Sequence, residues 1–256
     1  MYFSFGVISL KILVTGTNGY ISKSFAAYSQ AEQISLRGEW QKKSFVGYDA
    51  IVHAAGLVHQ KETRRNQYDY YIVNRDLAFE VAKKAKVEGI GQFVLLSSIS
   101  VYGLSYGTIT ADTLPKPTSN YGRSKLAAES LISSLEDENF SVAILRPPMV
   151  YGTDCPGNYS RLRTLVKFAP FFPDYENARS VVSIENLCAI ILDIVKSRKS
   201  GLFFPQDEYP LSTRDMALNI AVEQGKHLRL TRAFNWLLPL FNKSKLFGNL
   251  LITIKP

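Results

Sequence analysis

The sequence predicts an α/β fold, a doubly wound parallel sheet with a smaller C-terminal lobe. Short β-branched apolar runs alternate with helical patterns up to about residue 147, which is typical of successive βαβ units. A glycine-rich turn follows the first run and leads directly into a helix. We expect residues 11–150 to form the sheet domain, 151–256 to form a mixed α/β lobe, and 1–10 to be a leader of unclear role.

Each element has its own justification. KILVT, bounded by Gly16, is a continuous apolar run of the kind found in strands buried on both faces. In the longest helical pattern, Val73, Leu77, Val81 and Ala85 recur on one face. The expected strands are 11–15, 32–37, 49–55, 92–98 and 140–147, and the expected helices are 19–31, 68–87 and 119–135.

Composition bounds the classes of function. The chain has 256 residues, 46% hydrophobic and 20% charged, as in a soluble globular protein with a substantial core. Its 30 Lys and Arg against 22 Asp and Glu give a net charge of +8. The basic residues form scattered pairs without interleaved aromatics, so nucleic-acid binding is not expected. An anionic small substrate or cofactor explains the basic balance equally well.

Cysteine, histidine and hydropathy patterns exclude further classes. Cys155 and Cys188 form no C-x-x-C pattern, which fits a reducing cytoplasm, and three histidines predict no metal site. The first residues lack the basic region of a signal peptide, and no apolar run is long enough for a membrane span. Residues 234–254 come closest, but Pro239 and two lysines interrupt them. A buried or subunit-contact helix is expected there, with association to a membrane surface as the alternative.

The turn after the first strand indicates dinucleotide binding. Gly16, Gly19 and Ser22 form a G-x-x-G-x-x-S pattern that opens a helix. Glycines there let the backbone approach a pyrophosphate, whose charge the helix N-terminus favours. Serine replaces the usual third glycine at little packing cost. The sheet domain is therefore expected to be of the Rossmann type.

A second pattern is YGRSK, which places Lys125 four residues after Tyr121. On a helix the two side chains lie on the same face, one turn apart. They are either an acid–base couple or two surface residues that share a helix. The spacing alone does not decide between these interpretations.

Seven segments together decide between these two interpretations of Tyr121 and Lys125. They are TGTNGYIS, DAIVHAAG, YYIVNRDL with Asn74, FVLLSSISVYG, YGRSK, LRPPMVYG and ARSVVSIENL. In this order they resemble the extended short-chain dehydrogenases/reductases that act on nucleotide sugars, of the UDP-glucose 4-epimerase type. The resemblance runs from residue 11 to about residue 230.

This resemblance implies that Ser98, Tyr121 and Lys125 are catalytic. Free tyrosine has a pKa of about 10, and a nearby ammonium and an oxidised nicotinamide both favour the phenolate that accepts a proton. Ser98 is expected to hydrogen-bond the sugar oxygen. Its strand neighbour Ser97 should point the other way as a structural hydroxyl, and Ser100 is a weaker second contact.

The resemblance also implies ligand contacts, with NAD as the cofactor and NADP as the alternative. In place of the acid usual in NAD-selective sheets, Arg37 ends the second strand, where it favours a 2′-phosphate or stacks on adenine, while Glu39 can still reach a ribose. For the UDP-sugar, Ser98, Asn158 and Arg179 are the expected contacts, Arg179 through its guanidinium fork on the diphosphate. The expected cofactor contacts are Gly16, Asn18, Gly19, Tyr20, Ile21, Arg37, His53, Ala54, Ala55, Asn74, Tyr121, Lys125 and Pro148.

Three functions remain open. The first is epimerisation at C4 of a UDP-hexose or UDP-N-acetylhexosamine through a transient 4-keto sugar, and the second is NAD(P)H-dependent reduction of a 4-keto nucleotide sugar. The third is a non-catalytic NAD(P)-sensing regulator. Dehydration is not expected, because Ile99 and Ser100 stand where related 4,6-dehydratases carry Asp-Glu. Surface-polysaccharide precursor synthesis fits both enzymes, and a homodimer is the assembly that the resemblance suggests.

Overall fold

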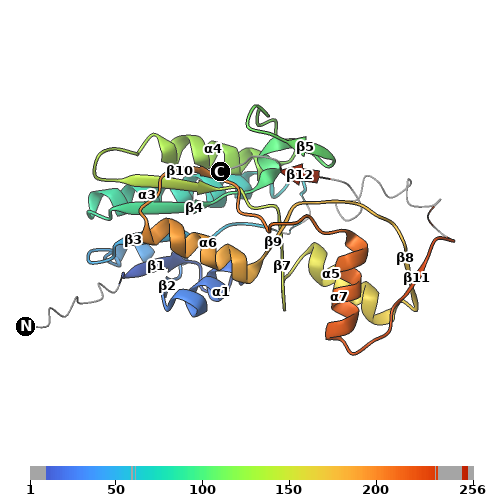
Figure 1. Cartoon of the computed structure of the whole chain (residues 1–256). Coiled ribbons are helices and arrows are strands. Elements are labelled where there is room, and N and C mark those ends of the chain that lie inside the picture. Colours follow the sequence, from blue (N-terminus) through green and yellow to red (C-terminus); the bar gives the residue numbers. More distant parts are fainter. Residues whose placement is uncertain (1–9, 59, 61, 234, 236–249, 253–256) are drawn as a thin grey trace, which may run out of the picture.

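A six-stranded parallel sheet forms the centre of the molecule (Figure 1). The computed structural model describes residues 10–58, 60, 62–233, 235 and 250–252. The strand order is β10-β6-β4-β3-β1-β2, and every neighbouring pair is parallel. The six strands are β1 (Ile12–Thr15), β2 (Glu32–Ile34), β3 (Ala50–His53), β4 (Gln92–Leu96), β6 (Ser141–Leu145) and β10 (Gly201–Phe203).

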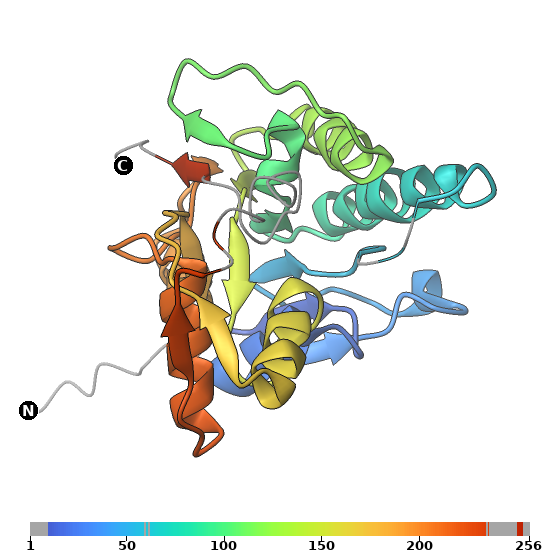
Figure 2. The ribbon, with the colours of Figure 1, turned by 90° about the vertical axis from the view of Figure 1, so that its right-hand side faces the viewer.

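Helices cover both faces of this sheet (Figure 2). One face carries α1 (Tyr20–Ser29) and α6 (Ile184–Lys196). The other face carries α3 and α4, with α2 and η2 leading into α3. These are α2 (Gln67–Tyr71), the π-helix η2 (Ile72–Asp76), α3 (Leu77–Val87) and α4 (Asn120–Ser133).

Alternation along each strand explains why the strands read as continuous apolar runs. In β4, Phe93 and Leu95 pack against α3 and α4, whereas Val94 and Leu96 pack against α1 and α6. Every residue of β4 is buried, as expected of a strand with helices on both faces. The expected doubly wound α/β fold is therefore confirmed.

The remaining elements form short sheets and a C-terminal lobe. The lobe has its own core, in which Leu162, Phe172 and Ile220 are fully buried. The paired short strands are β7 (Met149–Tyr151) with β9 (Val181–Ser183), β8 (Phe171–Pro173) with β11 (Arg229–Thr231), and β5 (Gly107–Ile109) with β12 (Leu250–Ile252). The other helices are η1 (Trp40–Lys42), η3 (Ile99–Tyr102), α5 (Asn158–Phe168) and α7 (Thr213–Glu223).

Two expected elements differ in extent. The second strand ends at Ile34 instead of residue 37, because its neighbour β1 ends at Thr15. The Gly16 N–H, which donates to the Ile34 carbonyl at 2.8 Å, forms the last backbone bond between the two segments. The helix expected over 68–87 is interrupted by η2, where the buried Asn74 side chain bonds the backbone of Leu57 instead of facing solvent. π-Helical turns of this kind are frequent at functional sites.

The segment after residue 150 contributes to both parts of the molecule. Helix α6 packs on one face of the central sheet and β10 is an edge strand of it, so residues beyond 150 also contribute to the sheet domain. Of the expected leader, residues 1–9 lie outside the described residues, as does most of the apolar stretch 234–254. Residues 250–252 of that stretch form the strand β12.

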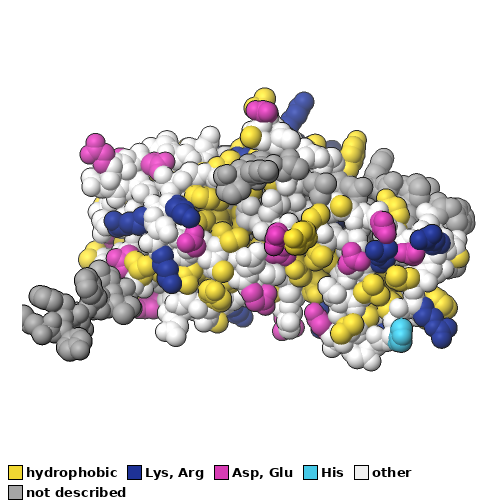
Figure 3. Space-filling view, viewed as in Figure 1, with side chains coloured by type: hydrophobic (Ala, Val, Ile, Leu, Met, Phe, Trp, Pro, Cys, Tyr) yellow, Lys and Arg dark blue, Asp and Glu magenta, His cyan; other side chains and the backbone are white. Residues whose placement is uncertain are grey.

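Charge on the surface is mixed. On the face shown in Figure 3, Lys and Arg side chains lie among acidic ones instead of gathering in one patch. Among the described residues, no helix is both long and apolar enough to cross a membrane. The same part of the chain contains no group of three or more His, Cys, Asp or Glu that could hold a metal ion.

Helix α6 offers a test of this architecture. Ile191 is fully buried against the sheet, so Ile191→Ala should lower the free energy of unfolding by about 2–5 kcal/mol. The matched control is Val222→Ala, because Val222 is 79% exposed on α7 and its loss should change stability by less than about 0.5 kcal/mol. Urea denaturation measures both. Equal, small effects would show that α6 is not part of the sheet core.

Candidate active site

The expected site residues follow the carboxyl ends of adjacent parallel strands. Strands β1, β3 and β4 end at Thr15, His53 and Leu96, and β6 ends at Leu145. In a doubly wound sheet, ligands bind along this edge where the strand order reverses, here between β1 and β3. The fold therefore brings the glycine turn, the β3 loop and helix α4 to one edge of the sheet.

The glycine turn leaves the start of α1 open. Gly16 has φ +94°, which favours glycine, and a Cβ there would lie 3.4 Å from the Ala55 backbone. Gly19 precedes α1 and no side chain caps the first turn of that helix within the described chain. Asn18 and Gly19 are exposed. Unpaired N–H groups at this helix N-terminus suit a pyrophosphate.

The next two residues of the expected cofactor set have different surroundings. The Tyr20 hydroxyl donates a 2.9 Å hydrogen bond to the Thr153 carbonyl, so its side chain joins α1 to the C-terminal lobe. Ile21 is half-buried and packs against the α6 side of the core. Both occupy the first turn of α1, where their backbone N–H groups lie at the open end of the helix.

The end of β3 carries a buried neutral histidine. His53 is fully buried, its Nδ1 lies 3.1 Å from the Thr15 hydroxyl, and that hydroxyl accepts the Ala55 N–H at 3.2 Å. Burial, together with the nearby Lys125, lowers the pKa of His53 to about 3. Its Nε2 has no partner among the described residues. The half-buried Ala54 and Ala55 continue this loop.

Asn74 locks the β3 loop to α4. From the π-helix η2 its carboxamide accepts the Leu57 N–H at 2.7 Å and donates to the Leu57 carbonyl and the Ser124 hydroxyl, both at 3.2 Å. A Cβ on Gly56 would lie 3.1 Å from Asn74 Oδ1 and 3.3 Å from Lys125 Nζ. A larger residue at position 56 would therefore crowd both side chains.

Helix α4 positions Tyr121 and Lys125. Ser119 caps the helix by accepting the Gly122 N–H at 3.0 Å, and the Glu62 carboxylate accepts the N–H groups of Asn120 and Tyr121 at 3.0 Å each. A carboxylate at a helix N-terminus is favoured by the helix dipole. Lys125 is 4% exposed and donates a 2.7 Å hydrogen bond to the carbonyl of Leu96, the last residue of β4.

Electrostatics distinguish this pair from surface residues. Burial lowers the pKa of Lys125 to about 8, against the opposing charge of Glu129. Burial raises the pKa of Tyr121 to about 12, although a hydrogen bond from Ser98 opposes the rise. The Tyr121 ring is half-buried and packs edge-on against Tyr70, with 6.4 Å between ring centroids. A further positive charge at the ligand site would favour the phenolate.

The two serines after β4 point in different directions, as expected. The Ser98 hydroxyl donates to the Ser100 hydroxyl at 3.1 Å and accepts the Ser100 N–H at 3.1 Å, and its side chain contacts that of Tyr121, whose pKa it lowers. The Ser97 hydroxyl instead donates to the buried carboxylate of Glu129. Ser98, Tyr121 and Lys125 are thus brought together.

The other expected contacts come from other segments of the fold. Arg37 is exposed three residues after β2, and Pro148 is buried after β6. Asn158 begins α5, and Arg179 is buried beside Leu211, with which it exchanges two backbone hydrogen bonds. Burial lowers the pKa of Arg179 to about 10. The ligand contacts of these four residues stay predictions.

Sequence reasoning missed four residues that support the site. Glu62 holds the start of α4, Ser124 accepts a hydrogen bond from Asn74, and Glu129 forms a buried ion pair with Arg146. The position of Glu129, one turn beyond Lys125, was a readable signal. Glu62 had none, because its contact with α4 joins residues 58 positions apart.

Observations of this structure fit the nicotinamide dinucleotide expected from the motifs. The Gly16 turn has the φ and the close backbone approach to Ala55 that such a cradle requires. The start of α1 is uncapped, whereas three N–H groups at the start of α4 are already bonded. Lys125 and the orphan Nε2 of His53 are buried polar groups next to the β3 loop.

Comparison with known proteins places the chain. Residues 37–169 match the model of the NAD dependent epimerase/dehydratase family. The chain belongs to this family. The UDP-glucose 4-epimerase of Vibrio cholerae is 31% identical over 211 residues, which cover 77% of this chain and 63% of the relative. The matched part thus spans less than two thirds of that relative's length.

Solved structures of epimerases and reductases share the fold of this family member. The UDP-glucuronic acid 4-epimerase of Bacillus cereus in complex with NAD has a TM-score of 0.73 at 19% identity, covering 96% of this chain and 88% of that chain. A dTDP-4-dehydrorhamnose reductase of Clostridium acetobutylicum has a TM-score of 0.70 at 18% identity, covering 94% and 95%. The family resemblance of the sequence motifs is confirmed, and NAD is the cofactor for which the family is named.

The burial of Lys125 predicts a pH dependence of stability. In the unfolded chain a lysine keeps its proton up to a pKa of about 10.4, whereas in the folded protein the pKa of Lys125 is about 8. Between these values the unfolded state binds more protons, so the free energy of unfolding should rise with pH through this residue. Urea unfolding at about pH 7.5 and about pH 9.5 should show a larger gain for wild type than for Lys125→Met. Equal gains would contradict the burial of a charged Lys125.

Proposed function

We propose that the protein is an NAD(P)-dependent nucleotide-sugar 4-epimerase that acts on a UDP-hexose or UDP-N-acetylhexosamine through a transient 4-keto sugar. The observation that carries the proposal is the contact between Ser98 and Tyr121 beside the buried Lys125, at the ligand-binding edge of a family fold. Similarity to a UDP-glucose 4-epimerase over most of the chain supports the choice of reaction.

Each side chain has a defined task in this proposal. Tyr121 takes the proton from the sugar 4-hydroxyl and later returns it. Lys125 lies one turn away with its ammonium held at the Leu96 carbonyl, where its charge favours the phenolate. Ser98 orients the reacting oxygen by hydrogen bonding. When bound, the nicotinamide supplies a hydride acceptor and donor.

The same residues limit the reaction type. A 4,6-dehydration would need a carboxylic acid and base directly after Ser98, and Ile99 and Ser100 provide neither. Ile99 and Ser100 are the first two residues of the short helix η3, whose first turn contains no acidic residue. We assign Arg179 to the nucleotide diphosphate. Asn158, which begins α5, is assigned to the same substrate.

A reductase of 4-keto nucleotide sugars is the second candidate, and the surroundings of Arg37 favour it. Two acids, one in β2 and one after it, already have partners. Glu32 accepts a 2.7 Å hydrogen bond from the Tyr48 hydroxyl, and Glu39 forms an ion pair with Lys42 at 2.6 Å. Arg37 is exposed and forms no ion pair with an acid of the described residues, which suits a 2′-phosphate and an exchangeable NADPH.

The direct test is C4 inversion. We expect the protein, supplied with catalytic NAD, to interconvert the C4 epimers of UDP-glucose or of its N-acetyl form, followed by proton NMR. No inversion of any such sugar, together with stoichiometric NADPH oxidation by a 4-keto-6-deoxy nucleotide sugar, would make the protein a reductase. No turnover in either assay would favour a regulator.

Tyr121→Phe tests the proton acceptor. The substitution removes only the phenolic oxygen, so turnover should fall about 10²–10⁴-fold while cofactor binding is largely kept. Tyr68→Phe is the matched control, because the Tyr68 side chain is exposed at the start of α2. Turnover close to wild type in Tyr121→Phe would overturn the assignment, whereas Lys125→Ala should both slow chemistry and weaken cofactor binding.

Arg37 allows the cofactor choice to be measured. For the epimerase we expect NAD to bind at least as tightly as NADP, and Arg37→Asp to strengthen NAD further by offering a carboxylate to the ribose hydroxyls. Calorimetric titration of both cofactors into both proteins measures this. A strong preference for NADP that disappears in Arg37→Asp would instead support the reductase.

A further inference from the structure

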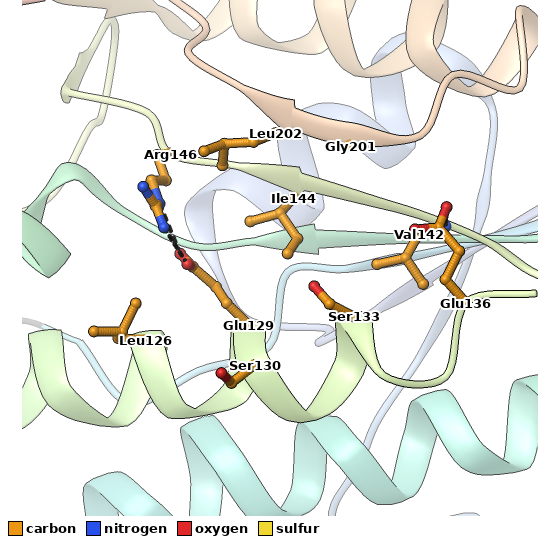
Figure 4. A pocket seen from close by; sticks show the side chains of 10 residues that line it. All are labelled: Leu126, Glu129, Ser130, Ser133, Glu136, Val142, Ile144, Arg146, Gly201 and Leu202. Atoms are coloured by element: carbon orange, nitrogen blue, oxygen red, sulfur yellow. Dashed lines mark hydrogen bonds and ion pairs between the residues drawn. The ribbon is translucent and has the colours of Figure 1, made fainter. Parts of the chain in front are cut away.

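The catalytic face of α4 continues for one more turn into a buried carboxylate. Tyr121, Lys125 and Glu129 follow one another at intervals of four residues, so they line one face of the helix. Glu129 is 4% exposed, like Lys125. It also lines a cavity between α4 and the β6–β10 edge of the sheet (Figure 4).

Both carboxylate oxygens of Glu129 accept hydrogen bonds. Arg146, which directly follows β6, donates from Nε at 3.1 Å and from Nη2 at 2.6 Å to the two carboxylate oxygens (Figure 4). The Ser97 hydroxyl donates to the same carboxylate. Arg146 also donates from Nη1 to the Tyr102 hydroxyl at 2.7 Å, and its guanidinium lies 5.0 Å from the centre of that ring.

These bonds join three segments that carry the proposed chemistry. Ser97 is the strand neighbour of Ser98, and Tyr102 ends the short helix that begins after Ser98. Glu129 lies on the helix that carries Tyr121. The network therefore fixes the end of β4 against α4 one residue from the contact between Ser98 and Tyr121.

Stability alone does not account for this network. Removing two charges from water is costly, and a well-packed apolar pair of similar volume often stabilises a fold as well or better. The ion pair lies next to the proposed acid–base couple, where the sign and position of charge affect chemistry.

Among the described residues, Glu129 is the negative charge that acts on Lys125. On α4, Tyr121 precedes Lys125 by one turn and is neutral when protonated. From β3, His53 is neutral because burial holds its pKa at about 3. At the start of α4, Glu62 is bonded to backbone N–H groups. Directly after β6, Arg146 donates to the Glu129 carboxylate.

We propose that Glu129, held by Arg146, is a positioning residue of the active site: its carboxylate favours the Lys125 ammonium and its bonds keep Ser98 aligned with Tyr121. This rests on the function proposed above. In this account the Glu129 charge opposes the loss of the Lys125 proton that burial promotes. Removing Arg146 alone would leave that charge uncompensated and strengthen its effect.

The test titrates Lys125 directly. In protein labelled with ¹³C at the lysine Cε, Lys125→Met identifies the Lys125 resonance, and its shift is followed against pH in cofactor-free protein. The midpoint should fall by about one pH unit in Glu129→Gln. In Arg146→Met it should stay or rise. In the double variant Glu129→Leu/Arg146→Met, an apolar pair, it should lie between those of wild type and Glu129→Gln.

Each outcome decides the proposal. An unchanged midpoint in Glu129→Gln, or a fall of equal size in both single variants, would overturn it, because a purely structural role predicts no opposite response to opposite charges. If a single variant fails to fold, the apolar double variant carries the test, and an unchanged midpoint there overturns the proposal. Since the titration needs no turnover, failure of the proposed enzymatic activity remains distinguishable. Where wild type is active, Glu129→Gln should lower kcat more than it changes KM and shift the pH profile in the same direction as the titration.

Discussion

The burial of the Lys125 ammonium beneath the sheet edge is the constraint on which the site depends. A lysine charge is costly to bury, and the fold accepts that cost by bonding Nζ to the Leu96 carbonyl at 2.7 Å. Leu96 ends the strand that leads to Ser98, so the bond also sets the distance from α4 to the serine that contacts Tyr121.

Several features that look separate follow from this constraint. The backbone of Gly56 approaches the ammonium closely, since a Cβ there would lie 3.3 Å from Lys125 Nζ. Asn74 turns inward from a π-helical turn to tie that loop to α4. His53, next to the same ammonium, stays neutral. Glu129 and Arg146 form a buried ion pair beside Lys125. Glu129 lies one turn beyond Lys125 on α4.

The sequence allowed the sheet, its helices and the central triad to be predicted, because those depend on local pattern and motif order. The apolar runs identified the strands, and the four-residue spacing placed Tyr121 and Lys125 on one helix face. The sequence did not reveal the π-helix, since the hydrogen bonds of the Asn74 side chain are made to a loop that is distant in sequence. The return of β10 to the sheet was missed for a similar reason: a three-residue strand has too little pattern, and its pairing with β6 is set by tertiary contacts. Glu62 likewise reaches α4 only through the folded loop.

In the proposed reaction, Tyr121 on α4 takes and returns the proton of the sugar 4-hydroxyl, while the hydrogen on C4 leaves and returns as a hydride. The most direct measurement uses a UDP-hexose that carries deuterium at C4, incubated with the protein and catalytic NAD in ordinary water. We expect the inverted product to keep its deuterium at C4, and Tyr121→Phe to form this product far more slowly. Inversion with loss of the deuterium to solvent, or equally fast inversion by Tyr121→Phe, would contradict it.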